Sequence, residues 1–67
     1  MIRLTVNGEN IQLFSANNLE QLLETLNLKE KRIAVEVNRE IIPRSEHGVT
    51  RLREGDRVEI VRAVGGG

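Results

Sequence analysis

The chain has 67 residues, enough for one small domain that buries only roughly 60% of the surface exposed by its unfolded form. It contains no cysteine, which excludes disulfides and thiolate zinc sites. Ten acidic and ten basic side chains cancel, which disfavours nucleic acid and anionic membranes as partners. No apolar run approaches the roughly 18 residues of a membrane span. We therefore expect a soluble cytoplasmic protein that is monomeric on its own.

The first 14 residues predict a β-hairpin. Ile2, Leu4 and Val6 alternate with polar residues, which is the period of a half-buried strand. Asn7-Gly8 is a strong hairpin signal, because both residues tolerate the positive φ of a type I′ turn. Alternation then resumes at Ile11.

The hydrophobic period changes to that of an amphipathic helix after the hairpin. Leu19, Leu22, Leu23 and Leu26 recur at spacings of three and four residues. Asn18 is placed to cap this helix, with Gln21 at its third position; Asn17 with Glu20 is the competing arrangement. We expect the helix to end at Asn27.

Three further extended segments follow. Ile33, Val35 and Val37 predict a strand, and a turn at 38–40 leads to Ile41-Ile42, which Pro43 confines to a sheet edge. We expect residues 44–56 to be irregular, with Leu52 as a core anchor, and a last strand over 57–64.

The element order predicts an α+β domain in which one helix covers one face of a mixed sheet of four to five strands. The domain spans residues 1–64. The expected core comprises Ile2, Leu4, Val6, Ile11, Leu13, Leu19, Leu22, Leu23, Leu26, Ile33, Val35, Val37, Leu52, Val58 and Ile60.

The glycines Gly65, Gly66 and Gly67 form the unusual feature of the chain. Glycine loses the most entropy on ordering, so residues 65–67 are expected to be a flexible tail. Three residues without Cβ atoms form a thin thread that reaches roughly 10 Å and can bring the Gly67 carboxylate into a narrow channel. A frayed end or an expression scar is the alternative interpretation.

Docking such a thread costs about 1–2 kcal/mol per ordered residue, so the folded body must supply compensating contacts. The alternation predicts that Val61 and Ala63 point away from the helix, opposite Val58 and Ile60. With Val64, they are the candidate partner-docking residues.

Four segments together resemble the ubiquitin-like β-grasp sulfur carriers, and among them the ThiS family of thiamine biosynthesis. They are IRLTVNGE (2–9), LEQLL (19–23), RIAVEVNREIIPR (32–44) and GDRVEIVRAVGGG (55–67). The resemblance implies a β-grasp fold and a non-catalytic carrier without a cofactor.

The resemblance also implies partners. A ThiF-like, ATP-dependent adenylating enzyme would activate the Gly67 carboxylate. A sulfur donor such as a cysteine desulfurase would convert it to a thiocarboxylate, and a ThiG-like thiazole synthase would take the sulfur into the thiazole ring. The small subunit of molybdopterin synthase and a ubiquitin-like binding or modifier module are the alternatives.

The remaining side chains offer little chemistry. His47 is the one histidine, without a second metal-ligating partner nearby in the sequence, and is expected on the surface of a loop. Ser45 and Thr50 lack an identifiable base. We therefore predict no catalytic residue and no metal site. Most of the arginines after Leu28 are interleaved with glutamates, as on a solvated surface; a docking patch for an acidic partner is the alternative.

Overall fold

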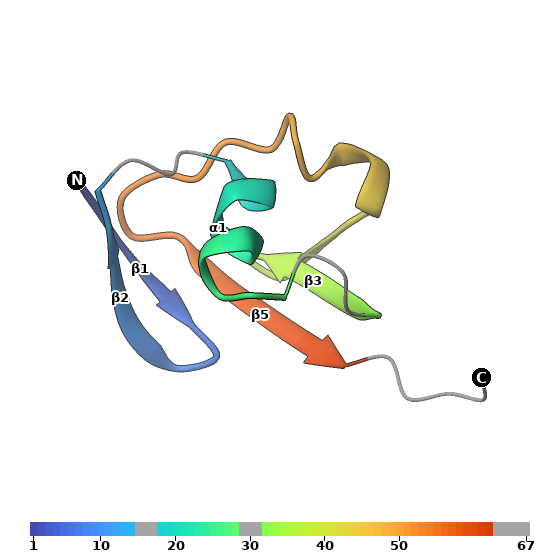
Figure 1. Cartoon of the computed structure of the whole chain (residues 1–67). Coiled ribbons are helices and arrows are strands. Elements are labelled where there is room, and N and C mark those ends of the chain that lie inside the picture. Colours follow the sequence, from blue (N-terminus) through green and yellow to red (C-terminus); the bar gives the residue numbers. More distant parts are fainter. Residues whose placement is uncertain (15–17, 29–31, 63–67) are drawn as a thin grey trace.

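The chain begins with an antiparallel β-hairpin. The computed structural model describes residues 1–14, 18–28 and 32–62. Strands β1 (Ile2–Val6) and β2 (Glu9–Leu13) pair along their whole length (Figure 1). Asn7 and Gly8 form the turn with φ values of 50° and 84°. Both values are positive, as a type I′ turn requires, so the predicted hairpin is confirmed.

Helix α1 (Leu19–Thr25) begins and ends close to where the sequence predicts. The Asn18 side chain caps it, because its Oδ1 accepts a hydrogen bond of 2.8 Å from the Gln21 N–H. The chain leaves the helix at Asn27, whose φ of 63° is incompatible with continued right-handed helix. Asn17, which the competing start invoked, lies outside the described residues.

A second hairpin follows. Strand β3 (Ile33–Val37) pairs antiparallel with the short strand β4 (Glu40–Ile42), and Asn38 and Arg39 turn the chain with φ values of 52° and 72°. Strand β4 lies at the sheet edge, as predicted from Pro43, since proline has no N–H to donate to a further strand.

The segment after β4 corrects one expectation. The sequence predicts irregular structure over 44–56, but Arg44–Glu46 form the 3₁₀ helix η1. Its hydrogen bonds run from the Glu46 N–H to the Pro43 carbonyl (2.9 Å) and from the His47 N–H to the Arg44 carbonyl (3.2 Å). Three residues are too short to show a hydrophobic period, so the pattern contained no signal for this turn.

The same segment is attached to the start of α1. The Leu19 N–H donates to the Thr50 carbonyl (2.9 Å), and the Glu20 N–H donates to the His47 carbonyl (3.2 Å). The first N–H groups of a helix have no partner within the helix. Loop carbonyls supply these partners here, which fixes the loop over the helix N-terminus.

Strand β5 (Arg57–Arg62) lies in the middle of the sheet. The strand order is β2-β1-β5-β3-β4, in which β1 and β5 run parallel and the other neighbours run antiparallel. Helix α1 covers one face (Figure 1). This is the mixed five-stranded β-grasp arrangement that was expected. The predicted strand extended to residue 64, and residues 63–64 lie outside the described part of the chain.

The core lies between α1 and the covered face of the sheet. All predicted core residues are buried or partly buried. The buried ones are Leu4, Val6, Leu13, Leu19, Leu22, Leu23, Val35, Val37, Leu52 and Val58. Ile2, Ile11, Leu26, Ile33 and Ile60 pack at the margin of this core. Leu52 shows that the long loop contributes to the core through the anchor predicted for it.

Candidate functional site

Strand β5 leads directly to the predicted tail. Strand β1 borders the first residues of β5 on one side, and β3 pairs with β5 from Val58 to Arg62 on the other, so β3 holds the end of β5 in the sheet. The last residue of β5 is Arg62. Ala63, Val64, Gly65, Gly66 and Gly67 lie outside the described residues. The flexible tail and the sulfur-carrying role of the Gly67 carboxylate therefore stay predictions.

Val61 points to the sheet face that α1 does not cover. Its side chain is 59% exposed, whereas Val58 is fully buried and Ile60 packs against the core. Val61 is paired with Ala34 across the β3–β5 ladder, and Ala34 is also exposed. The predicted orientation of Val61 is confirmed. Its role in docking is not tested by this orientation.

The uncovered face offers a further apolar side chain that the sequence analysis did not single out. Ile41 on β4 is 69% exposed and lies opposite Glu36 of β3. Glu36 in turn lies opposite Glu59 of β5, so Ile41 shares a cross-strand row with two glutamates, and Ala34 and Val61 form the neighbouring row on this face. We define Ala34, Ile41 and Val61 as the outer-face patch. The signal was the Ile41-Ile42 pair, since adjacent strand residues must point to opposite faces.

His47 differs from its prediction as a surface loop residue. Its side chain is only 7% exposed, and its Nε2 lies 3.2 Å from the Ile42 carbonyl oxygen. The turn at η1 and the attachment of the loop to α1 bring this histidine beneath the loop. A backbone carbonyl satisfies one ring nitrogen, which is typical of a structural histidine.

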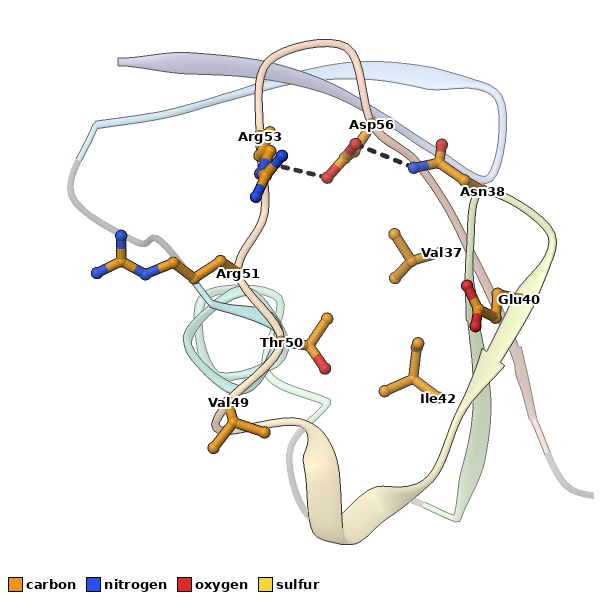
Figure 2. A pocket seen from close by; sticks show the side chains of 9 residues that line it. All are labelled: Val37, Asn38, Glu40, Ile42, Val49, Thr50, Arg51, Arg53 and Asp56. Carbon is orange, nitrogen blue, oxygen red and sulfur yellow. Dashed lines mark hydrogen bonds between the residues drawn. The ribbon is translucent and has the colours of Figure 1, made fainter.

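A pocket of about 530 Å³ lies between the β3–β4 hairpin and residues 49–56 (Figure 2). Asp56 is the one aspartate that lines this pocket, and both of its carboxylate oxygens accept hydrogen bonds. Oδ1 accepts from the Asn38 side-chain amide (3.0 Å), and Oδ2 accepts from the Arg53 N–H (2.8 Å). Both oxygens thus fix the turn that precedes β5. The arrangement is that of a structural carboxylate and not of a general base.

Other candidate chemical groups are also engaged in local structure. The Thr50 hydroxyl donates to the Glu46 carbonyl (2.7 Å), and Glu54 forms an exposed ion pair with Arg3 (3.5 Å). Within residues 1–14, 18–28 and 32–62, no three His, Asp or Glu side chains gather where a metal ion could bind. No helix in these ranges is both long and apolar enough to cross a membrane.

Comparison with known proteins adds the family. A model of the ThiS family matches residues 3–67. A thiazole synthase from Paramagnetospirillum magneticum is 36% identical over 98% of this chain, which covers 20% of that protein. The chain thus spans about a fifth of this relative's length. The uncharacterised protein ycf40 from Porphyra purpurea is 35% identical, with 98% of this chain and 93% of that protein covered.

Solved structures agree with this family. The crystal structure of the thiamine biosynthesis protein ThiS from Geobacter metallireducens matches with a TM-score of 0.84 and 33% sequence identity. The match covers 98% of this chain and all of that one. A solution structure of a thiamine biosynthesis protein from the same organism matches with a TM-score of 0.76 and 33% identity, covering 98% and 88% of the two chains.

Proposed function

The chain belongs to the ThiS family, and from this membership we propose that it is a sulfur carrier of thiamine biosynthesis that itself catalyses no step. The observation that supports the proposal most strongly is the extent of the family match. It runs over residues 3–67 and so includes both the β-grasp body and the terminal glycines.

The proposed chemistry takes place at the Gly67 carboxylate. A carboxylate is a poor electrophile, because a nucleophile would have to expel an oxide ion from it. Transfer of AMP from ATP gives an acyl-adenylate and releases pyrophosphate. Hydrosulfide then attacks the carbonyl carbon, AMP leaves, and the terminus becomes a thiocarboxylate. Where the sulfur comes from a protein persulfide, the attack forms an acyl disulfide, and a second thiol cleaves its S–S bond to release the thiocarboxylate and leave a disulfide on the donor. The activating groups belong to the partner, and this chain supplies the substrate carboxylate.

Three partners follow from this chemistry: a ThiF-like adenylating enzyme, a sulfur donor such as a cysteine desulfurase, and a ThiG-like thiazole synthase that receives the sulfur. One observation favours the last of them. The relative named thiazole synthase contains a segment similar to almost this entire chain within a much longer protein. A carrier joined to the enzyme that consumes its sulfur would deliver it at high local concentration.

We place partner docking on the outer-face patch and on the residues that lead from it into the tail. Val61 has an exposed apolar side chain at the end of β5, next to Ala34. Ala63 and Val64 would extend this surface toward Gly65 and Gly66. Contacts of this kind would offset the roughly 1–2 kcal/mol per residue that ordering the tail costs.

The test is a reconstitution followed by intact mass spectrometry. The native gene product is weighed first, because the proposal requires it to end at Gly67. It is then incubated with ATP and a ThiF-like enzyme, with and without a sulfide source. We expect an added adenylate without sulfide, and replacement of one oxygen by sulfur with it.

A semisynthetic chain with an amidated Gly67 is the matched control. It has the same length and sequence but no carboxylate, so its mass should stay constant. An unchanged mass of the wild-type chain with several ThiF-like enzymes, or modification of the amidated chain, would contradict the proposal.

A further inference from the structure

Strand β5 loses its partner on one side before it ends. On the β3 side the ladder continues to the pair Ile33 and Arg62. On the β1 side the paired residues are Thr5 with Arg57 and Val6 with Val58, and β1 then ends at the hairpin turn. The β1 strand therefore no longer borders the last part of β5, from which the chain continues into the tail.

The Asn7 side chain continues the ladder at this point. Its Oδ1 accepts a hydrogen bond of 2.8 Å from the Ile60 N–H, and its Nδ2 donates one of 3.2 Å to the Ile60 carbonyl. The Asn7 backbone N–H also donates to the Val58 carbonyl (2.9 Å). A primary amide has the same donor and acceptor as a peptide group, so this side chain replaces the missing strand residue.

Asparagine suits this position for two reasons. Asn7 has a φ of 50°, a region that asparagine tolerates better than most residues. Its short side chain also presents both a donor and an acceptor. Aspartate lacks the donor, and glycine allows the turn but contributes no side-chain hydrogen bond.

We infer that Asn7 is a positioning residue for carrier function, which sets the direction in which the chain leaves β5 toward a partner's active site. This inference rests on the proposed function, because a defined direction matters only if the tail must enter another protein. A fixed point of departure raises the fraction of docked complexes in which the terminus reaches the reacting groups.

The second hairpin turn provides a matched control. Asn38 has nearly the same φ, 52°, and its Oδ1 accepts a hydrogen bond of 3.0 Å from the Arg57 N–H. Its Nδ2 donates to Asp56 Oδ1 (3.0 Å). The two asparagines thus make similar contacts at opposite ends of β5, and only Asn7 does so in the half from which the tail departs.

Amide hydrogen exchange tests the contact itself. Asn7→Gly keeps the positive φ and removes both side-chain hydrogen bonds. We expect the Ile60 amide to exchange at least about ten-fold faster, while the core amide of Leu22 changes much less. Asn38→Gly should instead accelerate exchange at Arg57. Unchanged exchange at Ile60 in Asn7→Gly would overturn the inference.

Kinetics with a ThiF-like adenylating enzyme test the consequence. For Asn7→Gly we expect kcat for adenylation to fall by roughly ten-fold, as expected for two lost hydrogen bonds, with KM nearly unchanged. Asn7→Asp retains the acceptor for Ile60 and should recover part of this loss. Asn38→Gly should retain the wild-type kcat.

The outcomes separate the two proposals. A wild-type chain that is never adenylated would refute the proposed function, and the positioning role with it. An active wild type with unchanged kcat in Asn7→Gly would overturn the positioning role alone. A rise in KM at constant kcat would mean that Asn7 contacts the partner directly, and an equal loss in Asn38→Gly would indicate general destabilisation; both would also overturn it.

Discussion

Arg39 has a backbone conformation that its side chain does not favour. Its φ is 72°, and it follows Asn38 in the tight turn between β3 and β4. For a residue with a Cβ the left-handed region costs about 1–2 kcal/mol. Replacement by glycine removes this cost, but it also raises the conformational entropy of the unfolded chain, which offsets part of the gain in stability. We expect Arg39→Gly to stabilise the fold by about 0.5–1 kcal/mol in urea denaturation. A loss of stability would show that the Arg39 side chain makes a compensating contact.

Two glycines outside the tail differ in whether their backbone has the left-handed conformation. Gly55 has a φ of 88°, and an added Cβ would meet no atom within 4 Å, so the cost of Gly55→Ala is conformational only. We expect it to destabilise by about 1–2 kcal/mol. Gly48 lies outside the left-handed region, and its added Cβ would lie 3.7 Å from Glu20 Oε1. Gly48→Ala, the control, should be neutral or stabilising by up to about 1 kcal/mol. Equal melting temperatures of Gly55→Ala and Gly48→Ala would refute this distinction.

At the scale of elements, α1 depends on tertiary packing. It has seven residues, which is too short for a stable isolated helix. Leu22 lies on its buried face and is fully buried. Leu22→Ala removes this contact with the sheet and should lower the free energy of unfolding by about 2–5 kcal/mol.

Glu20→Ala is the control on the same helix, because Glu20 is exposed. Its effect should stay within about 0.5–1 kcal/mol, the size expected of a charge near a helix N-terminus. Similar losses in both variants by urea denaturation would mean that the packing of Leu22 contributes little to stability.

Local signals in the sequence predicted the elements that have a period or a turn motif. Asn7-Gly8 predicted the first hairpin, and the leucine spacing from Leu19 predicted α1 and its buried face. No local pattern in the sequence predicted the burial of His47 or the helix η1. Both depend on where a long polar loop meets the N-terminus of α1.

At the scale of the whole molecule, the strand order depends on contacts between distant residues. Asn7 bonds Ile60 and Arg3 bonds Glu54 across more than fifty residues. Alternation shows that a strand has a buried face but not which strand lies beside it, so the hydrophobic pattern did not predict the parallel pairing of β1 with β5. The outward face of Val61 was predictable from alternation, whereas Ile41 became a candidate only once β4 was paired with β3.

The proposed division of labour between body and tail predicts that activity and stability are separable. The core of the described residues is formed by side chains of the body, from Leu4 to Val58. If residues 65–67 act as an independent thread, a bulky substitution such as Gly66→Leu should leave the melting temperature nearly unchanged, because substitutions away from a core usually change stability by no more than about 0.5 kcal/mol. The same side chain should block entry into a channel shaped for glycine and abolish thiocarboxylate formation, measured by intact mass with the adenylating enzyme and sulfide.

Leu22→Ala should have the opposite effect, with lower stability and normal modification of the molecules that remain folded. If Gly66→Leu lowered the melting temperature substantially, the tail would belong to the body, and its proposed role as an independent thread would be wrong.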